Sequence, residues 1–449
     1  MGSVGCFGQI ENIKRQSLTK GNLAFSHTVE LYRKAVDFFI DVMRSRPDSI
    51  SECSTGSQAV NRIEPLTIPT VKRPEVPYDF SAKFYKFPCY LRRSAIAEAF
   101  GKYSSWVSNY RNWEENGRKG KAPGKPKAGF CFPAMYRDNT FVRTGTYTAS
   151  IKVWIRNTWD WVDVTLRKCD VDYISKRCSN RKECVPTFCR RGKVWSLDFC
   201  FEEKVKLNNT KIQEQRIVAV DLGINNACTC SVMCSDGTVV GRKFLRLPAE
   251  YDCLNHRINR IKQAQQRGAR RTPRLWGYAG NVNRHITELT ARFISDIAME
   301  YNADCVVFEA LELGGSKRGS MKQRLHLWRA RAVQSIVAGK VHRFGCRMSH
   351  VCAWNTSRLA FDGSGRVLRG SESECTSNNY SLCEFSNGKL YHCDLNASYN
   401  IGARYYIREL LKSVPATRRL QLEAKVPSVC KRSTCVLSDL ISLGAAMVA

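Results

Sequence analysis

The first hydrophobic pattern along the chain has the spacing of an amphipathic helix. Between Phe25 and Met43 apolar side chains recur every three or four residues, which places them on one face. A polar stretch with four prolines follows at residues 48–78, and this composition argues against regular structure. The segment Tyr90–Glu115 is again helical in character and mixes basic with aromatic side chains. Residues 1–140 are therefore predicted to be mostly helical.

Beyond residue 140 the pattern changes to an alternation of apolar and polar residues, so residues 141–213 are predicted to form a β-rich domain. Its expected strands are Tyr147–Ile155, Trp161–Leu166 and Val194–Phe201. Just before this change, Gly117–Lys127 is too rich in Gly, Pro and Lys to pack. We expect this segment to be an open loop whose charges stay solvated, serving either as a linker or as a grip on a phosphate backbone.

A short strand buried on both faces is predicted at Ile217–Val220, because the run is rich in β-branched residues and carries no charge. Asp221 follows directly, and Gly223 permits a tight turn after it. Two further strands, Ala227–Cys234 and Thr238–Leu245, complete a meander. A carboxylate at the exit of a central strand suits metal binding, because the strand fixes its direction. The alternative is an ordinary turn residue or helix cap.

Two further carboxylates lie at the end of a predicted strand or at the start of a predicted helix. A second buried strand ends in Glu309, with Glu312 as a competing carboxylate, and Asp394 begins the last long helix, where it could equally be a cap. The surrounding elements are expected to be helices at 254–266 and 282–299, a strand at 304–308, a helix at 321–344, an apolar run at 348–353, a Gly/Ser-rich insertion at 354–390 and a helix at 394–411. The pattern predicts no role for the tail at 413–449.

Strands with terminal carboxylates, separated by helices and led by a three-strand meander, predict a ribonuclease H-like α/β fold for this region. Asp221, Glu309 and Asp394 are each more than 80 residues from the next, so only a fold brings them together. Three carboxylates close together repel one another unless cations neutralise them. Hard oxygen ligands favour two Mg²⁺ ions, or Mn²⁺ in their place. Two such ions about 4 Å apart activate water and stabilise the leaving oxygen in phosphodiester hydrolysis.

Composition indicates the partner. The chain of 449 residues has room for two or three domains, and 43% hydrophobic residues indicate a globular protein. A formal net charge of +31 exceeds what solubility requires and predicts a polyanion, nucleic acid above all. We find no apolar run long enough to span a bilayer and no charged-then-apolar leader, so no membrane role is expected. The 21 cysteines are expected to be reduced, in the cytosol.

Basic side chains outside the strands are the candidate contacts to a nucleic-acid backbone, where they would position the partner and carry little sequence information. Those on the Tyr90–Glu115 helix could equally line the wet face of an ordinary core helix. The candidates are Arg92, Arg93, Arg118, Lys119, Lys121, Lys125, Lys127, Arg270, Arg271, Arg274 and Arg329.

The acidic motifs resemble those of the RuvC nuclease of the TnpB transposon proteins and of the compact type V CRISPR effectors. The matching segments are Val220–Asn225 (VDLGIN), Val306–Leu311 (VVFEAL) and Asp394–Ile401 (DLNASYNI). Weaker support comes from Leu325–Arg329 and from Thr356-Ser357, a pair that usually precedes a zinc ribbon in this family. The likeness is specific from about Arg216 to Arg408. Upstream, the expected elements resemble the family's helical recognition region and β-barrel-like wedge in order and character only.

The resemblance implies an RNA-guided, magnesium-dependent DNA endonuclease of a prokaryotic cell, with a RuvC domain at residues 214–412. Asp221, Glu309 and Asp394 correspond to the family's metal ligands. Guide RNA, from a transposon or a CRISPR array, would pair with target DNA while the protein reads a short flanking motif. The chain would act alone or as a homodimer. The alternatives are an RNA-guided DNA binder that does not cut and an actin- or sugar-kinase-like ATPase.

One departure from the family concerns zinc. The two C-x-x-C pairs of the usual ribbon fall on Ala360 and Gly363, and on Cys383 and Ser386, so four thiolates cannot be assembled. We therefore expect the insertion at 354–390 to fold without zinc, held by its own packing. The alternative is an irregular site built from Cys352, Cys375, Cys383, His392 and Cys393.

Overall fold

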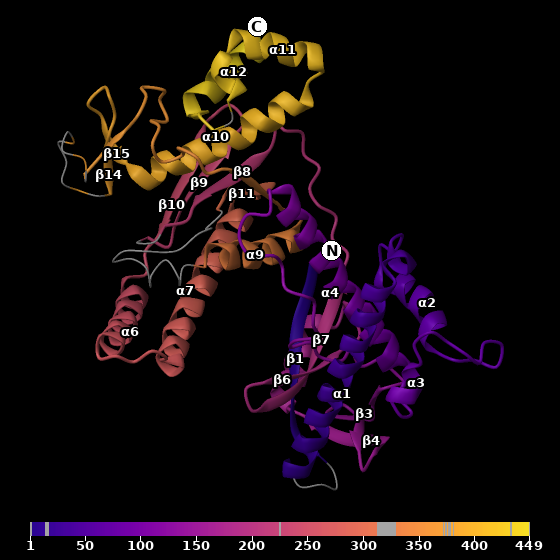
Figure 1. The fold of residues 1–449 in the computed structure, drawn as a ribbon. Coiled ribbons are helices and arrows are strands. Elements are labelled where there is room, and N and C mark those ends of the chain that lie inside the picture. The colour runs from indigo at the N-terminus through magenta and orange to yellow at the C-terminus, as the bar shows by residue number, and fades with distance from the viewer. Residues whose placement is uncertain are drawn as a thin grey trace. The chain divides into compact units, whose positions relative to one another are not determined.

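The computed structural model (Figure 1) divides the chain into two compact units, residues 3–203 and residues 204–449. Each contains helices and its own β-sheet, which confirms the predicted multidomain α/β architecture. The residues that the structure describes are 2–13, 18–223, 226–311, 329–370, 372, 375, 379, 381–431 and 433–448, with side chains from residue 23 onward.

Helices α1 (Leu18–Ser45) and α4 (Cys89–Glu115) are the two helices predicted for the N-terminal unit. The apolar stripe of α1 is buried, and its Tyr32 hydroxyl lies 2.9 Å from the Ser94 hydroxyl of α4. The expected irregular segment at 48–78 is wrong for its middle part, because Gly56–Thr67 forms helix α2. Thr55 and Gln58 make a capping box at its start, a sequence signal that the prolines masked.

A seven-stranded sheet forms the rest of this unit, in the order β2–β3–β4–β1–β7–β5 with β6 also paired to β7. Its strands are β1 (Gly2–Ile13), β2 (Phe141–Arg143), β3 (Thr148–Ile155), β4 (Thr158–Leu166), β5 (Lys182–Glu183), β6 (Thr187–Arg191) and β7 (Val194–Glu203). Two short helices, α3 (Phe80–Lys83) and α5 (Lys168–Cys178), complete the unit.

Strand β1 was not predicted, because residues 1–140 were expected to be mostly helical. It lies between β4 and β7 in the sheet, although three glycines weaken its strand pattern. Helices and strands of this unit share one hydrophobic core, in which Phe25 of α1 packs edge-on against Phe188 and Trp195. The finer division into a recognition region and a wedge stays a prediction.

The C-terminal unit is built on a five-stranded sheet in the order β10–β9–β8–β11–β12. Its strands are β8 (Arg216–Asp221), β9 (Cys228–Cys234), β10 (Val239–Leu245), β11 (Cys305–Ala310) and β12 (Arg347–Cys352). β8, β9 and β10 form the predicted antiparallel meander, whereas β11 lies parallel to both β8 and β12. Four of these strands were predicted within a few residues of these bounds, and β12 coincides with the apolar run expected at 348–353.

Strand β8 is buried on both faces, as its uncharged β-branched run predicts. Ile217 and Ala219 face a core that includes helix α10 (Cys393–Ser413), whereas Val218 and Val220 face the core of helices α7 (Pro273–Glu300) and α9 (Ala330–Val341). Figure 1 shows these helices on the two sides of the sheet. A Cβ at Gly402 of α10 would lie 3.2 Å from the Ala219 Cβ, so glycine allows this helix its close approach.

The predicted helix at 254–266 is α6 (Pro248–Gln266), which pairs with α7 as a hairpin. The helix expected at 321–344 corresponds to α9 and a 3₁₀ turn at 342–344, and its first residues, 321–328, lie outside the described part of the chain. The tail forms α11 (Ala416–Lys425), a 3₁₀ turn at 427–430 and α12 (Leu437–Val448). Leu440 and Leu443 of α12 are buried in the core of α10, so the tail is part of this unit.

The insertion forms a small antiparallel sheet of β13 (Leu368–Arg369), β14 (Leu382–Glu384) and β15 (Leu390–His392). Ala360 and Cys383, two of the four former ribbon positions, are buried in its own core together with Phe385. The ring of Phe361 packs edge-on against Phe385 and Tyr391, at centroid distances of 5.4 and 4.9 Å. Aromatic packing thus occupies the centre of this subdomain.

Arg404 of α10 is a buried cation that joins three separate segments. Its guanidinium donates to the carbonyls of Cys352 and Trp354 at 2.8 and 2.7 Å, and to those of Ser433 and Cys435 at 2.8 and 3.0 Å. Burial lowers the pKa of Arg404. Four carbonyls would lose their donor if this side chain were removed, and unpaired buried carbonyls are costly.

We expect Arg404→Met to weaken the attachment of α12. The free energy of local opening should fall by about 3 kcal/mol, so the amides of α12 should exchange with deuterium at least about tenfold faster. Mass-spectrometric hydrogen exchange measures this directly. Arg343→Met, which changes an exposed arginine of the same unit, is the control and should leave α12 unaffected. Unchanged protection of the α12 amides in Arg404→Met would contradict the role of Arg404 in attaching α12.

Candidate active site at the strand ends

Two neighbouring parallel strands of the C-terminal unit carry an acidic residue at or next to their last position. Val220 of β8 pairs with Phe308 of β11, so Asp221 and Glu309 are the next residues on adjacent strands. Asp394 lies in the first turn of α10, the helix that packs across β8 and β9. The fold therefore directs all three acids predicted from the sequence toward one region. Glu312, the competing carboxylate, lies outside the described residues.

Asp221 is buried and lies within the electrostatic influence of the other two acids. Burial raises the pKa of Asp221 well above its ordinary value, and the negative charges of Glu309 and Asp394 raise it further. Burial also raises the pKa of Glu309, against the opposing effect of a hydrogen bond from Thr356 and the charge of Arg404. Arg369 lowers the pKa of Asp221. The protein alone therefore stabilises the ionised carboxylates poorly, so a cation would be favourable here.

Neighbouring polar groups hold two of the acids in defined directions. The Asn226 amide donates to Asp394 Oδ2 at 2.8 Å, and the Thr356 hydroxyl donates to Glu309 Oε1. Gly223 shapes the turn after Asp221, because a Cβ there would lie 2.6 Å from the carbonyl oxygen of Asn226. Asn226 was missed in the sequence. Its position five residues after Asp221, beyond a glycine turn, is the signal that points back toward the site.

The loop that carries Thr356 is fixed by helix α10. The Asn400 amide donates to the carbonyls of Thr356 and Leu359, both at 2.9 Å, and the Asn396 amide donates to that of Leu359 at 2.9 Å. Phe361 N–H donates to Asn396 Oδ1 at 2.8 Å. Both asparagines are fully buried. The two asparagines of the third motif, one turn apart, therefore serve to position the loop that contacts Glu309.

The donor chemistry of the three acids fits a hard divalent cation, since every ligand would be a carboxylate oxygen. In the described part of the chain, however, no group of three or more Asp, Glu, His or Cys side chains is arranged so that it could hold a metal ion. Their roles as metal ligands therefore stay a prediction. The same holds for zinc, whose candidate ligands were named above.

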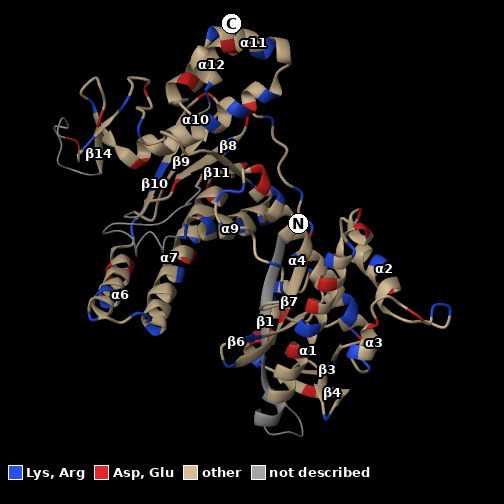
Figure 2. Ribbon diagram, in the orientation of Figure 1, with Lys and Arg blue, Asp and Glu red and all other residues tan. Residues whose placement is uncertain are grey.

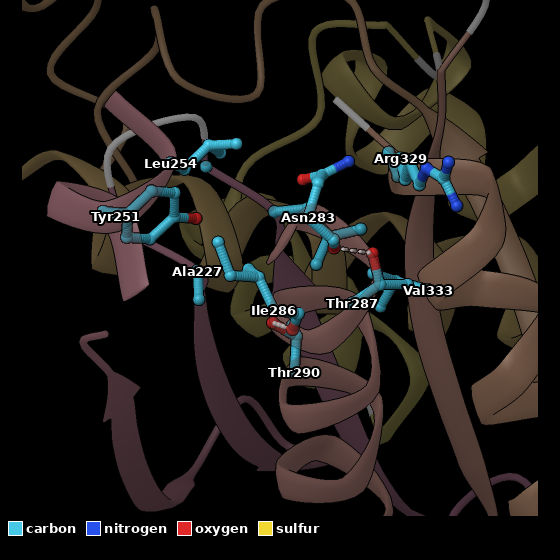
Figure 3. A pocket seen from close by; sticks show the side chains of 12 residues that line it. Ala227, Tyr251, Leu254, Asn283, Ile286, Thr287, Thr290, Arg329 and Val333 are labelled. Atoms are coloured by element: carbon cyan, nitrogen blue, oxygen red, sulfur yellow. Dashed lines mark hydrogen bonds between the residues drawn. The ribbon is translucent and has the colours of Figure 1, made fainter. Parts of the chain in front are cut away.

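A small cavity lies beside the exit of β8, at the base of the α6–α7 hairpin (Figure 3). It has a volume of about 40 Å³ and is lined by Leu222, Gly223 and side chains of both hairpin helices, among them Asn283 and Thr287. Arg329, a predicted nucleic-acid contact, lies at its edge (Figure 3). A space of this size accommodates a few water molecules and not a nucleotide.

Arg92 and Arg93 have a partner within the protein. Both pair with Glu64 of α2, at 2.9 and 3.1 Å, and Arg92 is largely buried. These ion pairs fasten α2 to α4, so the structure gives the two arginines a structural role. The residue that could have indicated this pairing in the sequence is Glu64, but it lies in the segment that was expected to be irregular.

The other predicted basic contacts lie on the surface. Arg270, Arg271 and Arg274 are exposed at the free end of the α6–α7 hairpin, where Figure 2 shows basic residues. Arg274 Nε donates to the Tyr278 hydroxyl at 3.0 Å. Tyr278 also lies beneath the guanidinium of Arg257, at 5.6 Å. Arg118, Lys119, Lys121, Lys125 and Lys127 are exposed in the loop after α4. The described helices include none that is long and apolar enough to cross a bilayer.

One family model and two proteins of known sequence each match part of this chain. Residues 11–155 match the model of the Aq_aa04 family. The uncharacterised protein aq_aa04 of Aquifex aeolicus (strain VF5) is 32% identical over 121 residues, which are 24% of this chain and 65% of that protein. The chain thus spans slightly less than two thirds of this relative. The TnpB-like protein aq_aa05 of the same strain is 28% identical over 239 residues, 47% of this chain and 74% of that protein.

A solved structure shares the fold. A chain of the Cas12f1–sgRNA–target DNA complex, determined by cryo-EM, is similar with a TM-score of 0.51 and 14% identity, over 85% of this chain and 81% of that chain. At this identity the likeness concerns the fold alone. Together with the TnpB-like relative, it confirms the resemblance predicted from the acidic motifs: the chain is similar in sequence to a TnpB-like protein and in fold to Cas12f1.

The raised pKa values of Asp221 and Glu309 predict how stability depends on pH. Because the folded state holds these protons more tightly than the unfolded state, the free energy of unfolding should fall as pH rises from about 4 through the raised values. Asp221→Asn removes one buried charge, so at pH 7 in EDTA its melting temperature should exceed that of the wild type by a few degrees, about 2–4 °C per kcal/mol. The difference should vanish near pH 4.

Thermal melts across this pH range, with and without Mg²⁺, check the prediction. Mg²⁺ should raise the melting temperature of the wild type at pH 7 and that of Asp221→Asn much less. Asp252→Asn, which changes an exposed acid of α6, is the matched control. An Asp221→Asn protein that melts below the wild type at pH 7 in EDTA would refute the role of buried negative charge.

Proposed function

We propose that this protein is an RNA-guided DNA endonuclease with one ribonuclease H-like (RuvC) active site, in which Asp221, Glu309 and Asp394 hold two Mg²⁺ ions. The observation that carries the proposal is the pairing of β8 with β11, which sets Asp221 and Glu309 on adjacent parallel strands. The relationship to TnpB and the fold shared with Cas12f1 support it. Cleavage, metal use and guide RNA are all part of the proposal.

Each part of the site has a distinct task in this proposal. When bound, divalent cations would activate a water and stabilise the leaving oxygen of the phosphodiester. Thr356 orients the Glu309 carboxylate and Asn226 that of Asp394, so less reorganisation is needed when ligands bind. The net charge of +31 supplies the general attraction for nucleic acid.

In this proposal the exposed basic residues of the protein contact the phosphate backbone of the nucleic acid. The free end of the α6–α7 hairpin offers Arg270, Arg271 and Arg274, and Arg329 lies close to the strand end that carries Asp221. These residues would hold nucleic acid through its phosphates without reading bases. Binding should therefore weaken steeply with salt. The active complex would contain one chain or a homodimer, and the molar mass of the purified complex distinguishes the two.

Sequencing the RNA that copurifies with the protein from cells containing its native locus is the direct test of guidance. A discrete structured RNA with one variable end is expected, and its genomic origin distinguishes a transposon end from a CRISPR array. If no such RNA copurifies and the protein still cleaves DNA, the protein is a nuclease that works without a guide. ATP turnover without nucleic acid would favour the kinase-like alternative.

Asp221→Ala is expected to reduce the rate of target-DNA cleavage by at least about 10³-fold, because it removes a ligand shared by the catalytic ions. Binding of guide RNA and target DNA should stay within about threefold of the wild type, since phosphate contacts dominate affinity. Cleavage kinetics and filter binding on the same preparations give both values. Asp252→Asn should cut like the wild type. A variant at Asp221 that binds poorly but cuts normally per complex would contradict the assigned role.

The insertion is expected to fold without zinc, because its centre holds Phe361, Phe385 and Tyr391 in place of four thiolates. Elemental analysis of protein purified without chelators should find well below one zinc per chain, and 1,10-phenanthroline should leave the melting temperature unchanged. Phe361→Ala should destabilise this subdomain by about 3 kcal/mol. One tightly bound zinc per chain would refute the expectation and favour the irregular cysteine site.

A further inference from the structure

A ladder of aromatic rings runs along the C-terminal half of α4 in the N-terminal unit. Tyr103, Trp106, Tyr110 and Trp113 follow one another with ring-centroid distances of 5.9, 5.4 and 5.4 Å. All four are partly buried. Their spacing of three or four residues places them on one face of the helix. The loop that follows the helix packs against part of this aromatic face.

The lysine-rich loop, defined as residues 117–127, is fastened to this ladder along its length. The Trp113 indole N–H donates to the carbonyl of Gly120 and the Trp106 indole N–H to that of Pro123, both at 3.4 Å. The Arg118 guanidinium lies over the Trp113 ring at 5.7 Å. Just after the loop, Ala128 N–H donates to an Asp37 carboxylate oxygen of α1 at 2.6 Å. The loop expected to be open is therefore held against the helix.

A groove remains between the loop and the helix. It has a volume of about 720 Å³ and is lined by residues of α4 between Ala97 and Asn109 and by residues of the loop between Pro123 and Lys127. Trp106, Lys102, Glu98 and Lys127 are among the lining side chains, and the exposed Lys125 lies in the same stretch of the loop. This is far larger than the 40 Å³ cavity of the C-terminal unit and has room for an unpaired nucleotide.

Positive charge surrounds the groove. Lys102 and Arg118 have acidic partners, Glu98 at 3.3 Å and Glu114 at 2.8 Å. For the exposed Lys119, Lys121, Lys125 and Lys127, no ion pair is found within the described residues. An aromatic floor flanked by unneutralised lysines matches the two chemical features of a single strand, an exposed base face and a phosphate backbone.

We propose that this groove binds a single-stranded segment of nucleic acid, with a base against Trp106 and adjacent phosphates on Lys125 and Lys127. The inference rests on the nucleic-acid role in the proposed function but does not require cleavage. Because the indole bonds hold the loop in place before binding, little ordering entropy is lost when the strand enters. The other occupant considered, duplex nucleic acid, offers no free base face to the indole.

The test uses the full chain and fluorescence anisotropy with labelled (dT)₁₂, (rU)₁₂ and a 12-base-pair duplex, titrated from 50 to 300 mM salt. The double variant Lys125→Gln/Lys127→Gln should weaken single-strand binding about tenfold or more near 0.1 M salt. It should also reduce the slope of log affinity against log salt by about 1.4, the value for two lost contacts to a single strand. Comparing the two oligonucleotides shows whether RNA or DNA is preferred.

The matched control is Lys72→Gln/Lys193→Gln, which removes the same charge from two exposed lysines elsewhere in the unit. It should leave the salt slope within about 0.3 of the wild type. An equal loss in both double variants would overturn the site, because attraction would then depend on net charge alone. Equal affinity of the wild type for the duplex would overturn the assignment to a single strand.

The base contact is tested at Trp106. Trp106→Phe keeps an aromatic face and should bind within about twofold of the wild type, whereas Trp106→Leu should lose about fivefold or more. Photocrosslinking of a 5-iodouracil-substituted single strand should label the peptide that contains Trp106. Crosslinks confined to other peptides would overturn the proposal even if Trp106→Leu were poorly folded.

A guided cleavage assay separates this inference from the proposed function. If the wild type cuts guided target DNA while Lys125→Gln/Lys127→Gln binds oligonucleotides normally, the groove fails and the nuclease stands. If the groove variants lose single-strand binding while no condition yields cleavage, the groove stands and the nuclease fails.

Discussion

The C-terminal unit depends on the burial of like charges at the ends of two adjacent strands. Asp221 and Glu309 lie side by side because β8 and β11 are parallel and in register, and the helix that brings Asp394 is packed against the same sheet. Each carboxylate raises the cost of ionising Asp221. A protein that keeps such an arrangement destabilises its own folded state at neutral pH unless a cation is present. The surrounding structure is best understood as the means of holding that arrangement.

Two devices maintain it. Burial of β8 on both faces fixes its register, because a slip of one residue would exchange the side chains that meet α10 for those that meet α7 and α9. Helix α10 then contributes through its polar residues: Asn396 and Asn400 bind the loop that contacts Glu309, and Arg404 binds the segment just before it. The third motif is therefore as much a support for the other two acids as a source of Asp394.

Much of the C-terminal unit could be predicted from the sequence, because its strands are short, uncharged and followed by acids, and its helices are strongly periodic. Four of the five strands were predicted in this way, the fifth was expected only as an apolar run, and the roles of the three acids stay a prediction. Strand β1 could not be, since its glycines hide the pattern and its pairing with β4 is long-range. Helix α2 was missed because the four prolines of the stretch 48–78 outweighed the capping box at Thr55. The pairing of Arg92 and Arg93 with Glu64 was also missed, because Glu64 lies in the segment that was expected to be irregular. The contact of Asn226 with Asp394 depends on tertiary structure, which sequence spacing does not reveal.

The four hydrogen bonds that Arg404 donates also join parts of the chain that are made at different times during synthesis. The loop after β12 takes its final form only with a guanidinium that must simultaneously bind Ser433 and Cys435. Those two residues emerge from the ribosome about 80 residues after that loop has been made, at typical rates several seconds later. Until then the Arg404 guanidinium lacks two of its four acceptors. The segments that pack around the three acids are therefore joined completely only when nearly the whole chain has been made.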